Sequence, residues 1–230
     1  MTSSVLATCG HFLRNKDTFR PLFEAAGITL HTPVLEAQQF EAAEMMQLLA
    51  DHDTVIAGDD FVSGEVLRAH KDHLKAVIKW GIGTDNIDKV SAAELGIPVY
   101  NTPGAFSDEV ADLALGMFLA VARKIPQLHN EVANGSWPRF EGMTLAGKTA
   151  GVIGLGGIGR AIAARTPAFG MKTLGYDPNT VPHSGTEQVD LETLAMQSDV
   201  IFLACELTPN NQHMVDASFL ARCKPGVYIV

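Results

Sequence analysis

The sequence has few cysteines, and none stands where a metal site or a disulfide framework would need it. Only Cys9, Cys205 and Cys223 occur in 230 residues, without C-x-x-C or other metal-ligand spacing. The pattern predicts reduced thiols in a cytoplasmic protein and no bound metal.

Basic clusters and long apolar runs are missing as well. The formal net charge is −9 and the isoelectric point about 5.3, and no cluster of lysine and arginine offsets this acidity. We therefore expect neither nucleic acid nor a membrane as a partner. The apolar runs are too short for a membrane span, and the first residues lack the basic segment and apolar core of a signal peptide.

In place of these features, the sequence contains a glycine-rich turn. The apolar stretch 149–153 runs into Gly154, Gly156 and Gly159, which have the G-x-G-x-x-G spacing, and an Ala/Ile-rich helical run follows. The first glycine permits a tight turn, the second lets a pyrophosphate approach the backbone, and the third lets the helix pack on its strand. The helix N-terminus then offers N–H groups and a positive dipole end to phosphates.

The surroundings of this turn predict a dinucleotide site. A second apolar strand, 171–176, ends in Asp177, which lies 18 positions after Gly159. Ribose-binding acids of such units lie about 20 residues beyond the glycines. Because strand, turn, helix, strand and acid occur in this order, we favour a ribose-binding role for Asp177 over a simple turn-capping role.

The whole chain alternates between strand and helix patterns, which predicts an α/β fold with parallel sheets. Strands are expected at 5–8, 28–31, 54–57, 76–80, 97–100, 149–153, 171–176, 200–204 and 227–230. Helices are expected at 17–26, 40–50, 64–70, 87–95, 107–123 (with Ser107 as N-cap), 125–133, 190–196 and 216–222, and loops at 134–138 and 178–185. The chain stops inside an apolar strand, so we expect it to be an N-terminal part of a longer protein.

Four ordered motifs make the chain resemble the D-2-hydroxyacid dehydrogenase family, in its D-3-phosphoglycerate dehydrogenase-like branch. They are KWGIGTDNID at 79–88, GIPVYNTPG at 96–104, VADL at 110–113, and GLGGIG at 154–159 with YDP at 176–178. The resemblance implies a flavodoxin-like substrate domain, here 1–101, and a Rossmann NAD-binding domain, here 102–230, both incomplete. It implies hydride transfer between NAD and C2 of a small D-2-hydroxy or 2-oxo acid.

The resemblance also assigns roles to individual residues. The cofactor-binding set is Gly154, Gly156, Gly157, Ile158, Gly159, Asp177, Cys205 and Ile82, and the substrate-binding set is Lys79, Gly81, Ile82 and Gly83. The backbone amides of Gly157 and Ile158 match those that meet the pyrophosphate. The 81–83 loop matches the one that holds the substrate carboxylate, and the nicotinamide end is expected near Ile82. The catalytic Arg, Glu and His of the family are expected beyond Val230, so no residue in this chain is assigned a catalytic role.

The chain departs from the family pattern in places that bear on the substrate. Glu206 stands at a usual proline, Asn211 at a common threonine, Phe106 at a frequent asparagine and Asp112 at a usual glutamate. Two alternatives stay open at this point. One is a non-catalytic NAD-sensing module like the co-repressors of this fold, and the other is a formate or phosphite dehydrogenase.

Several residues could have either a functional role or a purely structural one. Asp85 and Asp88 could act as general acid or base groups, but a position before a helix favours N-capping. His70 and His73 share a helical face, yet a metal needs more ligands, so surface histidines are expected. The apolar residues of 107–123 are first of all core, and a second apolar face there predicts a homodimer.

Overall fold

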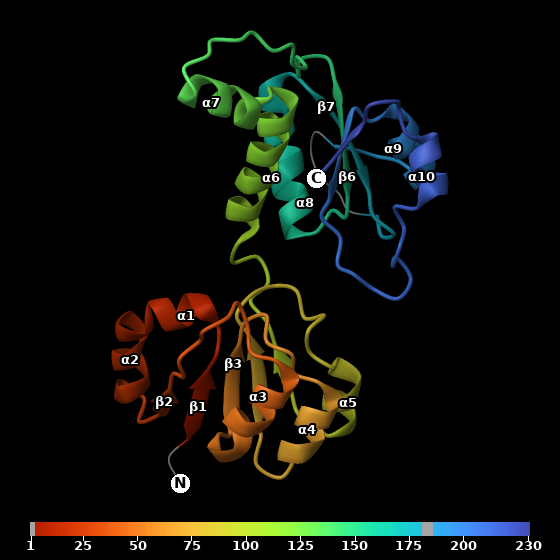
Figure 1. Ribbon diagram of the computed structural model, residues 1–230. Helices are drawn as coiled ribbons and strands as arrows, with labels where there is room; N and C mark the ends of the chain where they lie inside the picture. The colour runs from red at the N-terminus through yellow and green to blue at the C-terminus, as the bar shows by residue number, and fades with distance from the viewer. Residues whose placement is uncertain (1–2, 181–185) are drawn as a thin grey trace. The chain divides into compact units, whose positions relative to one another are not determined.

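The computed structural model describes residues 3–180 and 186–230. Its contacts divide the chain into two compact units, Met1–Ala105 (unit 1) and Phe106–Val230 (unit 2). The sequence had placed a domain boundary slightly earlier, between Asn101 and Thr102. Each unit is an α/β layer structure built on a parallel sheet (Figure 1).

Unit 1 has the strand order β2-β1-β3-β4-β5, and all the pairings are parallel. This is the flavodoxin-like order that the family resemblance implied. The strands are β1 Ser4–Ala7, β2 Thr29–His31, β3 Thr54–Ala57, β4 Ala76–Lys79 and β5 Val99–Tyr100.

The helices of unit 1 are α1 Gly10–Arg14, α2 Lys16–Ala25, α3 Ala42–Leu48 with the 3-10 turn η1 Leu49–Asp51, α4 Gly64–His70 and α5 Lys89–Glu94. The short α1 was not predicted from the sequence. Gly27 and Gly96 follow α2 and α5 with φ angles of 68° and 69°, the left-handed conformation in which glycine ends a helix. Two apolar clusters cover the sheet, one around Met45 and Val55 and one around Phe12 and Ile56.

Two interpretations of polar residues in unit 1 need correction. Asp88, rather than Asp85, is the N-cap of α5, because its side chain accepts a hydrogen bond from the Ser91 amide at 2.9 Å. His70 is buried rather than a surface residue, and its Nε2 lies 2.9 Å from the Met46 carbonyl. Helical spacing placed His70 and His73 on one face but could not show that α3 packs against that face.

Unit 2 has the parallel strand order β10-β9-β6-β7-β8. Its strands are β6 Thr149–Ile153, β7 Lys172–Tyr176, β8 Glu187–Gln188, β9 Val200–Leu203 and β10 Tyr228–Ile229. The chain leaves β6 toward β7 and later returns to the other side of β6 as β9. Ligands of open α/β sheets bind at this kind of switch point, outside the carboxyl ends of the strands.

The helices of unit 2 are α6 Ser107–Ala122, α7 Ile125–Ala133, α8 Gly157–Arg165 with the 3-10 turn η2 Thr166–Phe169, α9 Leu191–Gln197 and α10 Ala217–Arg222. Helices α6 and α8 pack together on one face, with Phe118 against Phe202, while α9 and α10 cover the other face. Ser107 was predicted to be the N-cap of α6, but it is the first helical residue, and the N-cap is Phe106.

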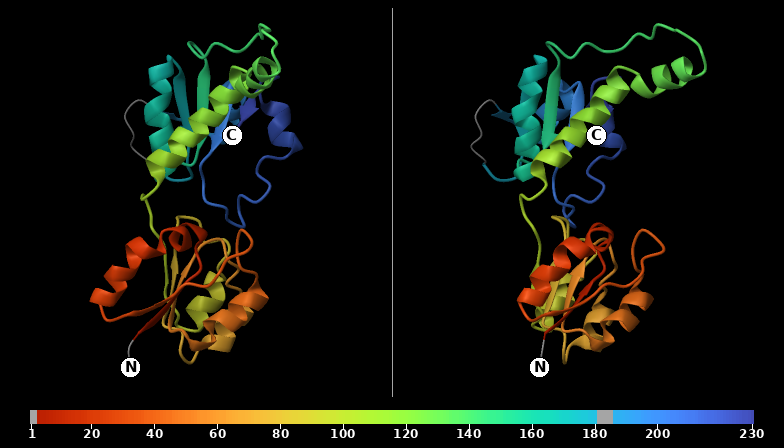
Figure 2. Two further views of the ribbon diagram at one scale, coloured as in Figure 1. Left: turned by 60° about the vertical axis from the view of Figure 1, so that its left-hand side comes forward. Right: turned by 90° about the vertical axis from the view of Figure 1, so that its left-hand side faces the viewer.

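The strand β8 was not expected, and part of the loop expected at 178–185 lies outside the described residues. The two views in Figure 2 show α7 extending beyond the sheet of unit 2 and an open connection returning from it to β6. Among the described residues, no helix combines the length and the apolar character needed to cross a membrane.

Candidate functional site

The glycine turn of unit 2 is packed so tightly that two of its three glycines have no space for a side chain. Gly154 follows β6 with a φ of 92°, and its amide donates to the Tyr176 carbonyl at 2.7 Å. A Cβ on Gly154 would lie 2.6 Å from the backbone of Cys205, and one on Gly159 would lie 1.8 Å from the Gly154 carbonyl oxygen. A Cβ on Gly156 would meet nothing within 4 Å. The first and third glycines are therefore required by the protein itself, and the second leaves open space beside the backbone.

This turn leads directly into α8, whose N-cap is Gly156 in an extended conformation. Gly157 and Ile158 are in the first turn of the helix, where backbone amides have no helical acceptor. The structure therefore places amides and the positive end of a helix at the carboxyl edge of β6, as phosphate binding requires.

Asp177 lies at the end of β7, beside the turn. One carboxylate oxygen accepts a hydrogen bond from the Leu155 amide at 2.9 Å, and the other accepts from the Asn179 amide at 3.0 Å. The side chain of Gln188 donates to the carbonyls of Asp177 and Asn179 at 3.1 and 2.7 Å. These contacts fix the carboxylate at the carboxyl ends of neighbouring strands.

A pocket of about 660 Å³ opens between this carboxylate and the loop after β9. Its lining includes Gly154, Gly156, Asp177 and Cys205 from the predicted set, and Tyr176, Glu206, Thr208, Asn211 and Met214 besides. Asn211 shapes the far wall, because its side chain accepts from the Thr208 amide at 2.7 Å and donates to the Glu206 carbonyl at 2.6 Å. The conformation of the loop that contains Asn211 could not be predicted from the sequence, so the part of Asn211 in the pocket wall was not predicted.

The predicted carboxylate-binding loop of unit 1 follows β4. Gly81 has a φ of 149°, and its carbonyl accepts hydrogen bonds from the amide and hydroxyl of Thr102 at 2.9 and 3.1 Å. The Asn101 side chain donates to the Ile82 carbonyl at 2.8 Å. Within the described residues, no group accepts from the amides of Ile82 and Gly83. The loop is thus held by its carbonyls, and two adjacent amides stay available to an anion.

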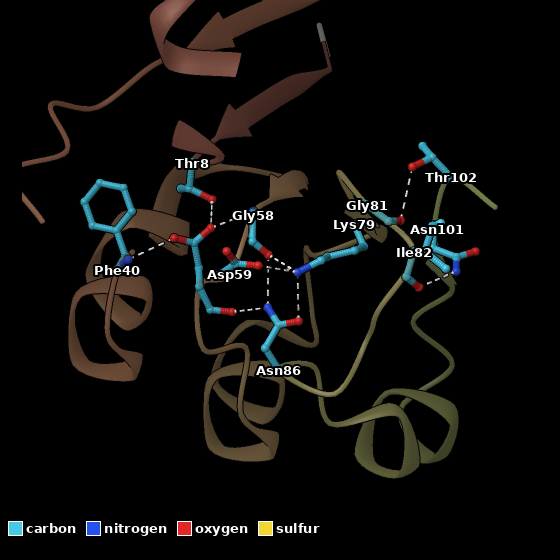
Figure 3. A network of polar contacts seen from close by, with 11 residues as sticks. Thr8, Phe40, Gly58, Asp59, Lys79, Gly81, Ile82, Asn86, Asn101 and Thr102 are labelled. Atoms are coloured by element: carbon cyan, nitrogen blue, oxygen red, sulfur yellow. Dashed lines mark hydrogen bonds and ion pairs between the residues drawn. The ribbon is translucent and has the colours of Figure 1, made fainter. Parts of the chain in front are cut away.

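Lys79 lies under this loop in a network of hydrogen bonds (Figure 3). Its Nζ donates to the Gly58 carbonyl at 2.6 Å, to Asp59 Oδ1 at 3.0 Å and to Asn86 Oδ1 at 3.1 Å. An ammonium group has three hydrogen atoms, and here each has a protein acceptor. The sequence predicted that Lys79 would contact the substrate anion, but this arrangement leaves no hydrogen atom of the ammonium for such a contact.

Asn86 and Asp60 extend the same network. The Asn86 side chain donates to the carbonyls of Gly58 and Asp60, at 3.1 and 2.7 Å. The buried Asp60 carboxylate accepts from Thr8 Oγ1, the Gly58 amide and the Phe40 amide, at 2.6, 2.8 and 2.9 Å. The loops after β3 and β4 are therefore joined by side chains, which fixes the backbone from which the Ile82 amide projects.

A pocket of about 420 Å³ lies over these loops in unit 1. It is lined by Gln39, Asp59, Phe61, Lys79, Trp80, Gly81, Ile82, Gly83, Asp85 and Asn86. The predicted substrate residues are thus gathered at one pocket, together with Gln39 and Phe61, which sequence motifs did not mark. The prediction that the nicotinamide end approaches Ile82 stays a prediction.

Neither pocket has histidine or arginine in its described lining. Across residues 3–180 and 186–230, no group of three or more His, Cys, Asp or Glu side chains is placed to hold a metal ion.

A parallel sheet with a glycine turn, a helix N-terminus and a strand-end acid at its switch point defines unit 2 as a dinucleotide-binding unit. Residues 115–230 match the family model described as the D-isomer specific 2-hydroxyacid dehydrogenase, NAD binding domain. The chain belongs to the D-isomer specific 2-hydroxyacid dehydrogenase family, and its cofactor is NAD.

Individual relatives agree with this assignment. The chain is 39% identical over 214 residues to a hydroxypyruvate reductase of Thermotoga maritima, covering 90% of this chain and 69% of that one. It is 38% identical over 204 residues to the D-3-phosphoglycerate dehydrogenase of Rattus norvegicus, covering 86% of this chain but only 38% of that one. The apo-structure of D-lactate dehydrogenase from Escherichia coli has a TM-score of 0.79 at 30% identity, covering 99% of this chain and 72% of that one.

Proposed function

We propose that the protein is an NAD-dependent oxidoreductase that interconverts a small D-2-hydroxy acid and its 2-oxo acid. The observation that carries the proposal is the presence, in one chain, of two different loops at the carboxyl edges of two sheets whose backbone amides suit an anion. The turn after β6 offers helix amides beside Asp177, and the loop after β4 offers the amides of Ile82 and Gly83. The relatives named as hydroxypyruvate reductase and D-3-phosphoglycerate dehydrogenase support it.

The residues present fit NAD by geometry as well as by family. The space beside Gly156 and the amides of Gly157 and Ile158 suit a pyrophosphate, and Asp177 can accept hydrogen bonds from ribose hydroxyls. When bound, NAD supplies the hydride acceptor, and its reduced form supplies the hydride. The protein's part is to hold the substrate carboxylate on the Ile82 and Gly83 amides and to keep C2 in a fixed orientation.

We propose that the groups that move the proton and orient the carbonyl lie outside residues 1–230. The family resemblance assigns these roles to an Arg, a Glu and a His, and neither described pocket contains His or Arg. A positioned general acid contributes about 10²–10⁴ in rate. Residues 1–230 alone should therefore bind NAD but turn over 2-oxo acids at least that much more slowly than a chain that includes those groups.

The test is NADH oxidation, followed by absorbance, with glyoxylate, hydroxypyruvate and 2-oxoglutarate as substrates. We expect turnover of at least one of them by the protein that contains the family's catalytic residues. Residues 1–230, folded as judged by circular dichroism, form the matched control. If the protein that contains the family's catalytic residues binds NADH but turns over no 2-oxo acid, the proposed reaction is rejected and an NAD-sensing role is favoured.

The protein should also form a homodimer through α6 and α7. Helix α6 buries Ala111, Leu115 and Phe118, yet exposes a second apolar stripe of Leu113, Met117 and Val121. Exposed Ile125, Leu128 and Val132 continue this stripe along α7 and line an apolar groove of about 380 Å³. Light scattering should show a dimer that Met117→Asp disrupts and Gln127→Asp does not. A wild-type chain that stays monomeric at high concentration would reject the dimer.

We place the protein in the cytoplasm. All three cysteines are free thiols, and exposed Cys205 lines the nucleotide pocket. A reducing compartment keeps such thiols unpaired. Fluorescence of a tagged protein in its own cells would test this placement, and a signal confined to a secreted fraction would contradict it.

A further inference from the structure

The charges around the unit 1 pocket distinguish between substrates of the proposed reaction. Among the described lining residues, Lys79 is the one cation, and Asp59 and Asp85 are carboxylates. A pocket that accepts a phosphorylated acid needs cationic groups for the phosphate in addition to donors for the carboxylate. The availability of the Lys79 charge therefore decides which acids this pocket can hold.

Lys79 and Asp59 present very different surfaces to a ligand. The Lys79 side chain is 7% exposed, whereas the Asp59 side chain, 3.0 Å from Nζ, is 70% exposed. The ammonium is covered and bound to three oxygens, so the charged group that faces the pocket is the Asp59 carboxylate. Asp85 lies on the same lining and adds a second negative charge.

We propose that Asp59 is a specificity-determining residue that restricts the substrate to 2-hydroxy and 2-oxo acids with an uncharged side chain. This inference rests on the proposed function. The substrate carboxylate is held by the Ile82 and Gly83 amides, and a phosphate on the far carbon would lie in the same small pocket as Asp59. Two negative charges in one pocket repel each other, and the pocket walls screen this repulsion less than bulk water alone would.

The same arrangement makes Lys79 a positioning residue. Through Gly58 and Asn86 it joins the loop after β3 to the loop after β4, as Figure 3 shows. Asp59 is the exposed partner of that cluster, and neutralising it removes a negative charge from the pocket without removing the contacts of Lys79 to Gly58 and Asn86. The variant Asp59→Asn should therefore convert an acid-lined pocket into one that tolerates a phosphate.

The experiment compares hydroxypyruvate with its 3-phosphate ester, which differ only in the phosphate. Calorimetric titration without cofactor gives the Kd of each, so the result does not depend on turnover. We expect the ester to bind wild type at least 100-fold more weakly, and Asp59→Asn or Asp59→Ser to reduce that ratio at least tenfold. Asp72→Asn, which removes an exposed carboxylate of unit 1 outside the pocket, should leave the ratio unchanged.

The outcomes separate this inference from the proposed reaction. Equal or tighter binding of the ester by wild type, or a ratio that Asp59→Asn leaves within twofold of wild type, overturns the specificity role. Failure of hydroxypyruvate to bind at all also overturns it, because the pocket would not be a 2-oxo acid site. The expected binding ratios without any NADH oxidation would support the role of Asp59 and reject only the reaction.

Discussion

Unit 1 and unit 2 both have, after a strand of a parallel five-stranded sheet, a loop that we propose binds an anion, but they build the loop by different means. In unit 2, three residues separate β6 from α8, and the backbone is so close-packed that a Cβ on Gly159 would overlap a carbonyl oxygen. In unit 1, the chain runs irregularly from Lys79 to α5 at Lys89. There the loop is held by the side chains of Asn86, Asn101 and Thr102.

The difference determines which substitutions each site can accept without losing its conformation. A backbone-built site keeps its geometry only while its close-packed glycines, Gly154 and Gly159, stay glycine, and we propose that the neighbouring acid Asp177 selects its ligand. A side-chain-built site can change its charge while the loop keeps its conformation, as the pair of Lys79 and Asp59 illustrates. The following predictions test this contrast, beginning with the largest effect.

Gly159→Ala should lower the free energy of unfolding of unit 2 by about 3 kcal/mol, since overpacking of a rigid site costs about 1–3 kcal/mol and here the obstacle is backbone. NAD binding should be lost with it. Urea unfolding and hydrogen exchange of β6 amides measure the change. Gly156→Ala is the control, because a Cβ there meets nothing within 4 Å, and its unfolding midpoint should match wild type. Equal midpoints for both variants would contradict a backbone-determined site.

Lys79→Met should lower the free energy of unfolding by about 2–3 kcal/mol. It leaves the Asn86 side-chain oxygen without its Lys79 donor and removes one of the two donors to the Gly58 carbonyl. Lys75→Met is the control. Lys75 is 70% exposed and pairs with Asp53 at 2.7 Å, and exposed pairs contribute about 0–1 kcal/mol. Denaturant titration measures the free energy of unfolding of both variants. Similar decreases for the two would contradict the claim that the buried hydrogen bonds of Lys79 stabilise unit 1.

Asp177→Ala should weaken NAD binding about tenfold, or about 1.4 kcal/mol, and should reduce the preference for NAD over NADP. In the proposed complex the carboxylate would accept from ribose hydroxyls and would repel a 2′-phosphate. The next residues Pro178, Asn179 and Thr180 include no arginine to neutralise that phosphate. Calorimetry with each cofactor gives the ratio, with Glu192→Ala as an exposed-acid control. Equal affinity of wild type for NAD and NADP would remove this role from Asp177.

Acidification should destabilise unit 1 through His52 and His70. Burial lowers the pKa of His52, and the neighbouring His31 lowers it further, while burial also lowers the pKa of His70. Below the ordinary value of about 6.5, the unfolded chain binds protons that the folded chain does not. Stability is therefore full above that value and falls as the pH drops toward the lowered pKa.

Hydrogen exchange at β1 and β3 between pH 7.5 and pH 5.5 should reveal this small loss of stability. His52→Gln should flatten the pH dependence, whereas His129→Gln, at an exposed position of α7, should not. An unchanged pH slope in His52→Gln would show that this histidine is not responsible.

Much of the fold could be predicted because its signals are local. Short apolar runs predicted the buried strands, and Gly27 and Gly96 follow α2 and α5 at left-handed φ angles, where glycine ends a helix. The strand β6 was predicted with the bounds 149–153 that the structure has. Glycine spacing and the acid after β7 predicted the nucleotide turn, because the chemistry of that turn is contained in consecutive residues.

The sequence by itself determined the class of the fold, the cofactor turn and the family, since each is a property of short stretches in order. Only the tertiary structure decided which side chains from distant stretches form ion pairs and hydrogen bonds with each other, and which are buried. It brought Asp59, 20 positions before Lys79, within 3.0 Å of the ammonium, and it packed His70 under α3. The physical reason is that hydrogen-bond partners and burial depend on which strands become neighbours, and no local pattern of residues contains that information.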